Sequence, residues 1–273
     1  MSWILRSNDE VPLAPERKRM AGEALGILAL VAALALLLCK PIHQAASYHD
    51  FHDTRALLGI PNLLNVLSNL PFVAIGLAGL NWLAGPQHGM PLPLVRAYAT
   101  LMTGTLLTGI GSAWYHYAPT HASLVWDRLP MAIAFMGLFA VMIGERLSLD
   151  ACRWLLAPLV GFGIASVLYW QVFDDLRPYV LTQFLPLLTI PLLLAWLPAA
   201  YSRGRDIMAV LGIYGVAKGL EFADGAIFCL GPSVSGHTLK HIAAAVGAAL
   251  LLRMLQARRP VPNYGSSSVS QYR

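Results

Sequence analysis

Residues 152–172 read CRWLLAPLVGFGIASVLYWQV, a stretch whose only charged side chain belongs to Arg153. A helix of about 20 apolar residues is long enough to cross the hydrocarbon core of a bilayer. Comparable stretches occur elsewhere in the chain, at 21–39, 63–84, 95–117, 125–145, 180–198, 207–229 and 236–256. The sequence therefore predicts a polytopic membrane protein with eight spans.

The composition of the chain agrees with a lipid environment. Hydrophobic residues make up 57% of it, charged residues only 12%, and the mean hydropathy is +0.59, whereas a soluble domain carries about a quarter charged residues. The net charge of +5 comes from short basic clusters between apolar stretches. Because these clusters form no basic stripe with aromatic residues, we expect no nucleic-acid partner.

The backbone of each span must satisfy its own hydrogen bonds, because lipid offers no partner to free peptide groups. The expected fold class is therefore all-α, a polytopic transmembrane helix bundle. Basic residues precede the first span and recur in alternate connections, at Arg96, Arg146, Arg153, Arg203, Arg205, Arg253, Arg258 and Arg259. By the positive-inside rule, both termini are expected on the cytoplasmic side.

The first span, 21–39, follows a long basic segment, and no small-residue cleavage site closes it. A transmembrane anchor is therefore favoured over a cleaved signal peptide. Residues 1–20 are expected to form a cytoplasmic N-terminal segment. Residues 258–273 contain a serine-rich run and are expected to form a disordered cytoplasmic tail.

Two pairs of polar residues share the spacing that places side chains on one helix face. Ser112 and His116 are four residues apart, and so are His237 and His241. Two histidines at positions i and i+4 of a helix can bind one metal ion, as in zinc-binding helices. The spacing therefore favours a metal site.

The expected topology brings these residues to one depth. The span 95–117 runs outward and ends at His116, whereas the span 236–256 begins outside with His237 and His241, and Asp127 opens a span on the same side. Ionisable groups within a membrane are costly and usually mark function. The alternative is that the histidines only bond across helices. Five further histidines lie in loops without this spacing and are expected at the surface: His43, His49, His52, His88 and His121.

Several short motifs occur together in one order along residues 50–250. They are Asn62-x-x-Asn65-x-x-Ser68-Asn69, Gly111-Ser112-x-x-x-His116, Trp126-Asp127-Arg128-Leu129-Pro130-Met131, Asp224 followed by Phe228-Cys229, and His237-x-x-x-His241. Their combined spacing resembles the alkaline ceramidase family within the CREST superfamily.

The resemblance implies a seven-helix, ceramidase-like membrane domain, here residues 40–257, with 21–39 as an extra N-terminal transmembrane helix. It also implies zinc held by the residues that match His116, His237 and His241, with Ser112 and Asp127 beside it. Such a protein would act on a membrane lipid, at a site facing the non-cytoplasmic leaflet.

The resemblance also raises the question of whether the protein binds calcium. Eukaryotic members bind it through an acidic segment before the first core helix. The corresponding residues 48–53 have fewer carboxylates, and Asn62 stands where the family has glutamate. Asp50, Asp53 and Asn62 are the candidate ligands, and this departure argues against a calcium site.

The implied reaction is hydrolysis of the amide bond of a ceramide-like N-acyl lipid to a fatty acid and an amine. Three histidines leave the fourth position of a zinc ion open, and zinc-bound water ionises near neutral pH. Asp127 would transfer the proton to the leaving amine, and Ser112 would stabilise the oxyanion. The alternatives are helix packing for Ser112, and a helix cap or a pair with Arg128 for Asp127.

Lys218, Glu221 and Asp224 are spaced three residues apart, so they form one polar stripe on the span 207–229. Mutual charge compensation, with Lys240 joining the stripe, is the simpler interpretation. The alternative is that Glu221 or Asp224 orients a zinc-binding histidine through its second ring nitrogen. Asn65, Ser68 and Asn69 are expected to bond across helices.

Three other functions compete with hydrolysis. A seven-helix receptor of the same superfamily would carry the same polar residues around a structural or vestigial zinc site. A transporter would use the stripe at 218–224 as an ion relay, but it predicts an inverted repeat, and none is visible. A purely structural role leaves the converging ionisable residues without explanation.

Overall fold

The computed structural model describes residues 15–85, 89–231 and 233–261. This part of the chain is helical and contains no β-sheet, which confirms the all-α prediction. Parts of some predictions lie outside the described residues: the first fourteen residues of the N-terminal segment, His88, and the tail from 262 onward.

Each predicted span is helical. The helices are α1 (Pro15–Leu38), η1 (Ala46–His49), α2 (Leu63–Leu67), α3 (Leu70–Ala84), α4 (Leu92–Tyr117), α5 (His121–Arg146), α6 (Leu149–Phe173), α7 (Arg177–Trp196), α8 (Gly204–Phe222), α9 (Asp224–Leu230) and α10 (Gly236–Ala257).

Two of the predicted spans are broken into two helices. The span 63–84 divides at Ser68 and Asn69, just before Pro71, which has no N–H to continue the preceding helix. The span 207–229 divides at Ala223, where α8 ends and α9 begins. Both breaks lie beside residues of the candidate site described below.

In the part of the chain that the structure describes, six helical segments are long and apolar enough to cross a membrane: α1, α2 with α3, α5, α6, α7 and α10. The other two predicted spans, α4 and α8, carry more polar side chains, threonines along α4 and Asp206, Lys218 and Glu221 on α8. Both nevertheless pack within the bundle, α4 between α3 and α5, and α8 against α10. Of these polar residues, Thr105, Thr108, Lys218 and Glu221 line the cavity described below.

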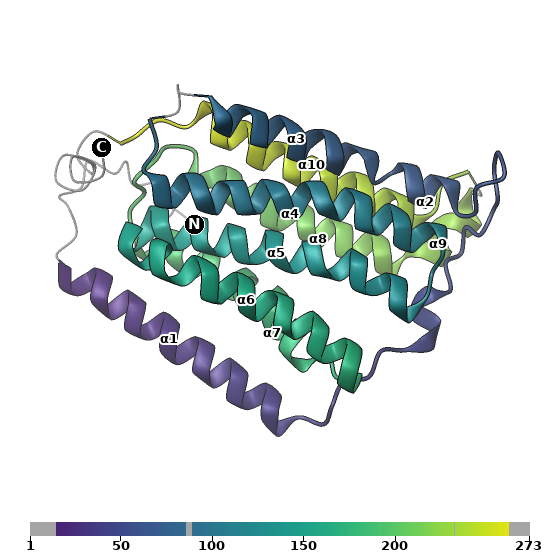
Figure 1. Cartoon of the computed structure of the whole chain (residues 1–273), viewed down its shortest axis with the longest axis horizontal. Coiled ribbons are helices and arrows are strands. Elements are labelled where there is room, and N and C mark those ends of the chain that lie inside the picture. Colours follow the sequence, from purple (N-terminus) through teal and green to yellow (C-terminus); the bar gives the residue numbers. More distant parts are fainter. Residues whose placement is uncertain (1–14, 86–88, 232, 262–273) are drawn as a thin grey trace.

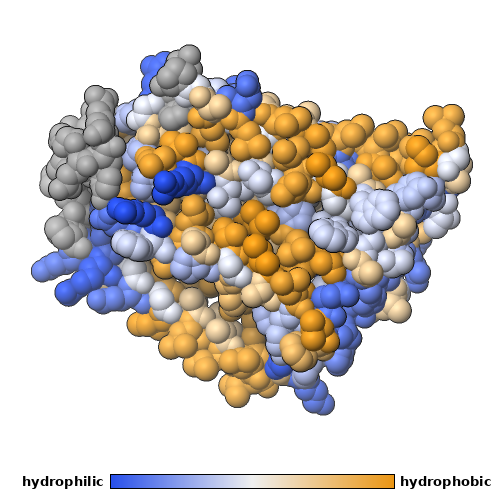
Figure 2. Space-filling view, in the orientation of Figure 1, coloured by the Kyte–Doolittle hydropathy of each residue, from blue (hydrophilic) through white to orange (hydrophobic). Residues whose placement is uncertain are grey.

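The long helices run side by side along the long axis of the molecule, and α1 lies at the edge of the bundle (Figure 1). α1 packs chiefly against α7. That α1 is an extra helix added to a seven-helix core stays a prediction. Apolar side chains cover much of the visible sides of the helices, and hydrophilic residues gather toward the two ends (Figure 2).

The two ends of the bundle differ in their polar residues. His116 is near the end of α4, and His237 and His241 are in the first turns of α10, so all three lie at the end that carries α2 and α9 (Figure 1). We call this the histidine end. The opposite end, which we call the arginine end, carries the start of α4 and the end of α10, with Arg96 and Arg258.

Candidate metal centre

Three histidines from two helices converge at the histidine end. Their side chains are buried, and their nearest ligand atoms all lie within 4.8 Å of one another. The ring centroids of His116, His237 and His241 are 4.7 to 4.9 Å apart in every pairing. The i, i+4 spacing therefore produces one buried cluster of imidazoles.

Two glycines allow the helices to approach closely enough for this cluster to form. A Cβ atom at Gly111 would collide with the carbonyl oxygen of Trp126 on α5. Pro130 has no N–H to bond that carbonyl in the helix, so the Trp126 oxygen is free to face α4. A Cβ atom at Gly236 would collide with the Leu220 carbonyl and the Asp224 backbone. Each glycine directly precedes a candidate site residue.

Ser112 and Asp127 meet across the contact between α4 and α5. Both side chains are buried, and the Ser112 hydroxyl lies close enough to the Asp127 carboxyl to act on it. Both also line a cavity of about 330 Å³ that His241 and Lys240 share. The structure thus brings the predicted serine and aspartate together beside one of the three histidines.

The ring of His241 is held by a residue of another helix. Ser68 Oγ is 2.8 Å from His241 Nδ1, and Ser68 also donates to the carbonyl oxygen of Asn65. Thr238 donates to Asn65 Oδ1 at 2.7 Å. The break between α2 and α3 therefore fixes the orientation of one imidazole and leaves its Nε2 for the interior of the cluster.

Asp224 acts on the backbone of α10. Its Oδ1 accepts a hydrogen bond from the backbone N–H of His237 at 2.7 Å, and its Oδ2 accepts one from the backbone N–H of His52 at 3.2 Å. It thereby holds the first turn of α10. The sequence analysis considered a bond from this carboxylate to a ligand ring, but the carboxylate meets His237 through its backbone.

Glu221 forms ion pairs with two lysines. Lys218 Nζ and Lys240 Nζ each lie 2.7 Å from one of its carboxylate oxygens. Lys240 Nζ is also 3.4 Å from His237 Nε2. The charge compensation that the stripe predicted is therefore present for Lys218, Glu221 and Lys240.

A family model described as Ceramidase matches residues 58–212, more than half of the chain. The chain belongs to the ceramidase family. The matched region includes Ser112, His116 and Asp127 and ends before His237 and His241. No match was found among curated proteins.

An aromatic side chain that sequence reasoning missed covers the histidines of this ceramidase-family protein. The buried ring of Phe51 lies 4.7 Å from the ring of His116 and 4.7 Å from that of His237, centroid to centroid. Phe51 belongs to the segment 40–62, which links α1 to α2 and includes η1. No spacing in the sequence relates Phe51 to either helix, so only the folded path of this segment reveals the contact.

The loop histidines anchor the same segment. His43 Nδ1 is 3.0 Å from Asp174, and His49 lies 2.9 Å from the Tyr115 hydroxyl and 2.8 Å from His121. Partial burial lowers the pKa of His49, and the nearby His121 and Arg128 lower it further. His43 lies in a loop as predicted, whereas His49 ends η1 and His121 begins α5, so the loop prediction was wrong for these two.

The candidate calcium ligands have other partners. Both carboxylate oxygens of Asp53 are bonded by Arg55, at 2.7 and 2.8 Å, which holds the pKa of Asp53 below its usual value. Asn62 donates its side-chain N–H to the His116 carbonyl, and Asp50 is exposed. A guanidinium thus neutralises the best candidate ligand. Calcium binding stays a prediction that these contacts do not favour.

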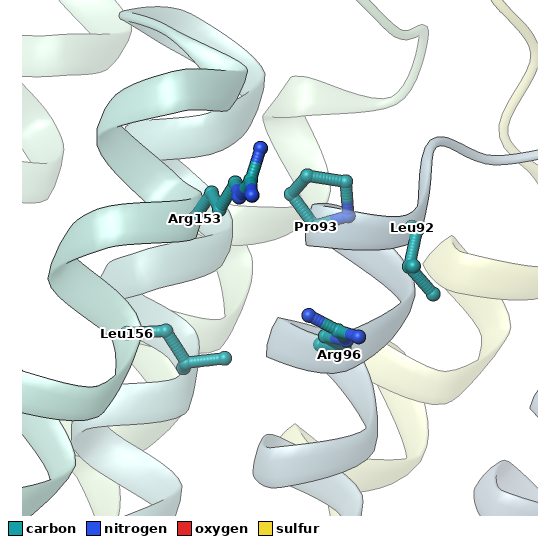
Figure 3. Close-up of a pocket in the computed structure, with 5 residues that line it drawn as sticks. All are labelled: Leu92, Pro93, Arg96, Arg153 and Leu156. Atoms are coloured by element: carbon teal, nitrogen blue, oxygen red, sulfur yellow. The ribbon is translucent and has the colours of Figure 1, made fainter. Parts of the chain in front are cut away.

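A second hollow, of about 290 Å³, lies at the arginine end (Figure 3). It is lined by Leu92, Pro93, Arg96, Arg153 and Leu156. Because α4 separates Leu92 from His116 by more than six turns, this hollow is remote from the histidine cluster. Its lining offers neither a carboxylate nor an imidazole for metal binding or acid–base chemistry.

The donor set of the cluster fits a metal ion. Three buried imidazoles offer neutral nitrogen ligands, and no carboxylate pairs with their rings among the described residues. The Nδ1 atom of His116 is buried without a hydrogen-bond partner in that part of the chain. Burying a polar atom without a partner costs free energy. A bound metal would give the ring nitrogens of this histidine cluster a partner.

Proposed function

We propose that this protein is a zinc-dependent intramembrane hydrolase that cleaves the amide bond of a ceramide-like N-acyl lipid. The observation that carries the proposal is the buried cluster of His116, His237 and His241 beside Ser112 and Asp127, which line one cavity with His241. Membership of the ceramidase family supports the choice of reaction.

His116, His237 and His241 would hold the metal. Three histidines with an open fourth position are typical of catalytic zinc sites, and such an ion supplies Lewis-acid activation of water at neutral pH. Ser68 keeps the His241 ring in the orientation that presents Nε2 to the cluster, and Asp224 fixes the backbone of His237. Phe51 packs its apolar ring against the rings of His116 and His237.

Asp127 moves the proton. Its carboxylate takes a proton from the attacking water and delivers it to the nitrogen of the leaving amine, which is a poor leaving group without that proton. The Ser112 hydroxyl, which lines the same cavity as Asp127, would donate its one proton to the carbonyl oxygen as negative charge develops there.

The cavity suits a lipid chain. From Ser112 and Asp127 it extends along the helices to Leu101 on α4 and Leu138 on α5. Eleven residues of helix separate Leu101 from Ser112, which is about 16 Å at a rise of 1.5 Å per residue. We propose that the acyl chain occupies this apolar length and that the substrate enters laterally from the bilayer.

The proposed orientation places both termini in the cytoplasm. Arginines concentrate at the arginine end, as the positive-inside rule requires of a cytoplasmic face. The metal cluster would then open toward the non-cytoplasmic leaflet. Cysteine labelling at position 121 tests this: access from the non-cytoplasmic side is expected, and labelling only from the cytoplasm overturns the orientation.

The decisive experiment combines metal analysis of the purified protein with hydrolysis of a panel of N-acyl lipids. The wild type should contain about one zinc ion per chain and release fatty acid. His237→Ala should lose both. His43→Ala, which removes an exposed histidine from the same end of the bundle, is the matched control and should keep both.

Two results would contradict the proposal. Full zinc content and full activity in His237→Ala would remove the assigned ligands. Bound zinc with no hydrolysis of any lipid in the panel would favour a receptor of the same superfamily over a hydrolase.

A further inference from the structure

Arg128 is a buried cation at the mouth of the cavity. Only 6% of the residue is exposed. Its guanidinium carbon lies 4.2 Å from the ring centroid of Trp170, 5.1 Å from that of Tyr179 and 5.3 Å from that of Tyr48. Nη2 donates to the side-chain oxygen of Gln44. All of these neighbours are uncharged, so they position the cation without neutralising it.

Among the described residues, no carboxylate forms an ion pair with Arg128, although its charge acts on the neighbouring Asp127. Arg55, Arg177, Arg203 and Arg258 each form an ion pair with an aspartate or glutamate. Arg128 forms none, and its Nη1 is buried without a hydrogen-bond acceptor in that part of the chain. Burying an unpaired charge is costly. A buried guanidinium with a free donor beside a cavity therefore indicates a ligand that supplies the acceptor.

The other charges of the cavity favour an anion as well. Lys218 and Lys240 share the single carboxylate of Glu221. Together with Arg128 and Asp127, the lining carries three cations against two carboxylates, a formal excess of one positive charge. An uncharged lipid headgroup leaves this excess uncompensated in a region of low dielectric constant.

The lining is polar at one end and apolar at the other. Arg128, Asp127 and Tyr48 line the histidine end of the cavity, whereas Leu101 and Leu251 line its deep part. With the acyl chain in the deep part, the amine half of the substrate lies beside Arg128. The planar donor fork of arginine matches the oxygens of a carboxylate or phosphate.

We propose that the lipid substrate carries an anionic group on its amine half, a carboxylate or a phosphate, and that Arg128 is the specificity-determining residue that binds it. This inference rests on the proposed amide hydrolysis and names its substrate class. The chain would thus act on N-acyl lipids of the N-acyl amino acid or phosphorylated ceramide type in preference to neutral ceramide.

Two matched substrate pairs test the inference. The first is N-palmitoylglycine against its methyl ester, and the second is ceramide 1-phosphate against ceramide. A charge-assisted hydrogen bond contributes about 1.5–3 kcal/mol, so kcat/KM for the anionic member of one pair should exceed that for its neutral partner by roughly 10- to 100-fold. The pair that shows the preference identifies the anion.

Arg128→Gln should bring the ratio of anionic to neutral kcat/KM close to one, and Arg128→Lys should restore part of it. Arg153→Gln, which changes an exposed arginine at the opposite end of the bundle (Figure 3), is the matched control and should keep the wild-type ratio. Thermal melting of each variant shows whether it has folded.

The inference is overturned if the wild type hydrolyses the neutral member of both pairs at least as well, or if Arg128→Gln leaves the ratio unchanged. Such results leave amide hydrolysis itself intact. If no lipid is hydrolysed, the proposed function fails, and equilibrium binding of the same four lipids to the metal-free protein decides the inference. Tighter binding of an anionic member that Arg128→Gln removes supports it, and equal binding overturns it.

Discussion

Arg128 and Arg258 are both buried arginines held by aromatic rings, at opposite ends of the bundle. The side chain of Arg258 is 3% exposed, lies over Tyr98 and Tyr201, and forms an ion pair with Glu145. Arg128 lies among three aromatic rings and has no ion-pair partner in the described residues. The two sites share their chemistry but differ in charge balance.

This difference separates a structural cluster from a binding site. At the arginine end, Tyr98 donates to Glu145 at 2.7 Å, and Arg258 donates to Tyr98, so these three side chains join α4, α5 and the residue after α10. Arg258 Nε and Arg128 Nη1 are both buried without a hydrogen-bond partner in the described residues, so the difference lies in the counter-ion that Arg258 has and in the cavity that Arg128 lines. The comparison predicts that substitutions at the histidine end reduce activity, whereas substitutions at the arginine end reduce stability.

The largest effect is expected at Asp127. Asp127→Asn preserves the shape of the side chain but removes the proton acceptor, so turnover of the lipid substrate should fall by about 10²- to 10⁴-fold. Zinc content and melting temperature should remain close to wild type, because Asp127 is not among the three ligands. Steady-state kinetics beside metal analysis measure both.

Asp206→Asn is the matched control for this substitution, since Asp206 pairs with Arg203 at the arginine end. It should leave turnover unchanged. An unchanged rate in Asp127→Asn would remove Asp127 from the reaction, and a loss of zinc in that variant would show that the carboxylate holds the site together.

The next largest effect is on stability, at Glu145. Glu145→Gln leaves the buried Arg258 without its counter-ion, and such a change costs about 3–5 kcal/mol. Denaturant titration in detergent should show this loss in the free energy of unfolding. Arg128→Gln leaves no ion unpaired and should change the free energy of unfolding much less.

The double variant Glu145→Met with Arg258→Met tests the cause. Replacing both ions by apolar side chains is often neutral or stabilising, so the double variant should recover much of the loss. Equal losses in the single and double variants would show that packing around Glu145, and not the unpaired charge, stabilises the arginine end.

The helices could be predicted from the sequence because a bilayer requires long apolar stretches, which are visible without tertiary information. The predicted positions of helix starts are less accurate. α5 begins at His121, four residues before the predicted span, because Thr120 and Ser123 form a capping box. The breaks at Ser68 and Ala223 were not predicted, since hydropathy continues across them.

The site residues could be predicted only where they lie on the same helix or at the same expected depth in the membrane. His237 and His241 are related by local spacing, and His116 by topology. Phe51 and Gln44 lie in the segment 40–62, whose path over the histidine end depends on tertiary contacts. The bond from Ser68 to His241 joins residues that are 173 positions apart. The sequence could therefore predict that Ser68 bonds across helices, but not that its partner is His241.

A smaller effect is expected at Ser68. Ser68→Ala removes the bond to His241 Nδ1 and frees the ring to turn. Loss of such an orienting partner typically weakens metal affinity by about 10- to 100-fold. Competition with a zinc chelator should detect this shift.

Ser166→Ala is the matched control. It removes a buried serine that donates to the Gly163 carbonyl on α6, and it should leave the zinc affinity unchanged. Equal zinc affinity in both variants would contradict the positioning role of Ser68.

The smallest effect is a pH dependence of the segment 40–62. The pKa of Asp174 is lowered first by the backbone N–H of Gln44 and then by His43. A depressed carboxyl pKa stabilises the folded state above the ordinary value near 4, and this contribution is lost as the pH falls through the folded pKa.

Acidification should therefore loosen the segment 40–62. The protection of its amides, which is their exchange rate compared with the intrinsic rate at the same pH, should fall in the wild type as the pH drops below about 4. Asp174→Asn should exchange faster near neutral pH and change less with acid, because its side chain cannot be protonated. Identical acid profiles for the two proteins would show that other carboxylates, Asp53 among them, attach this segment to the histidine end.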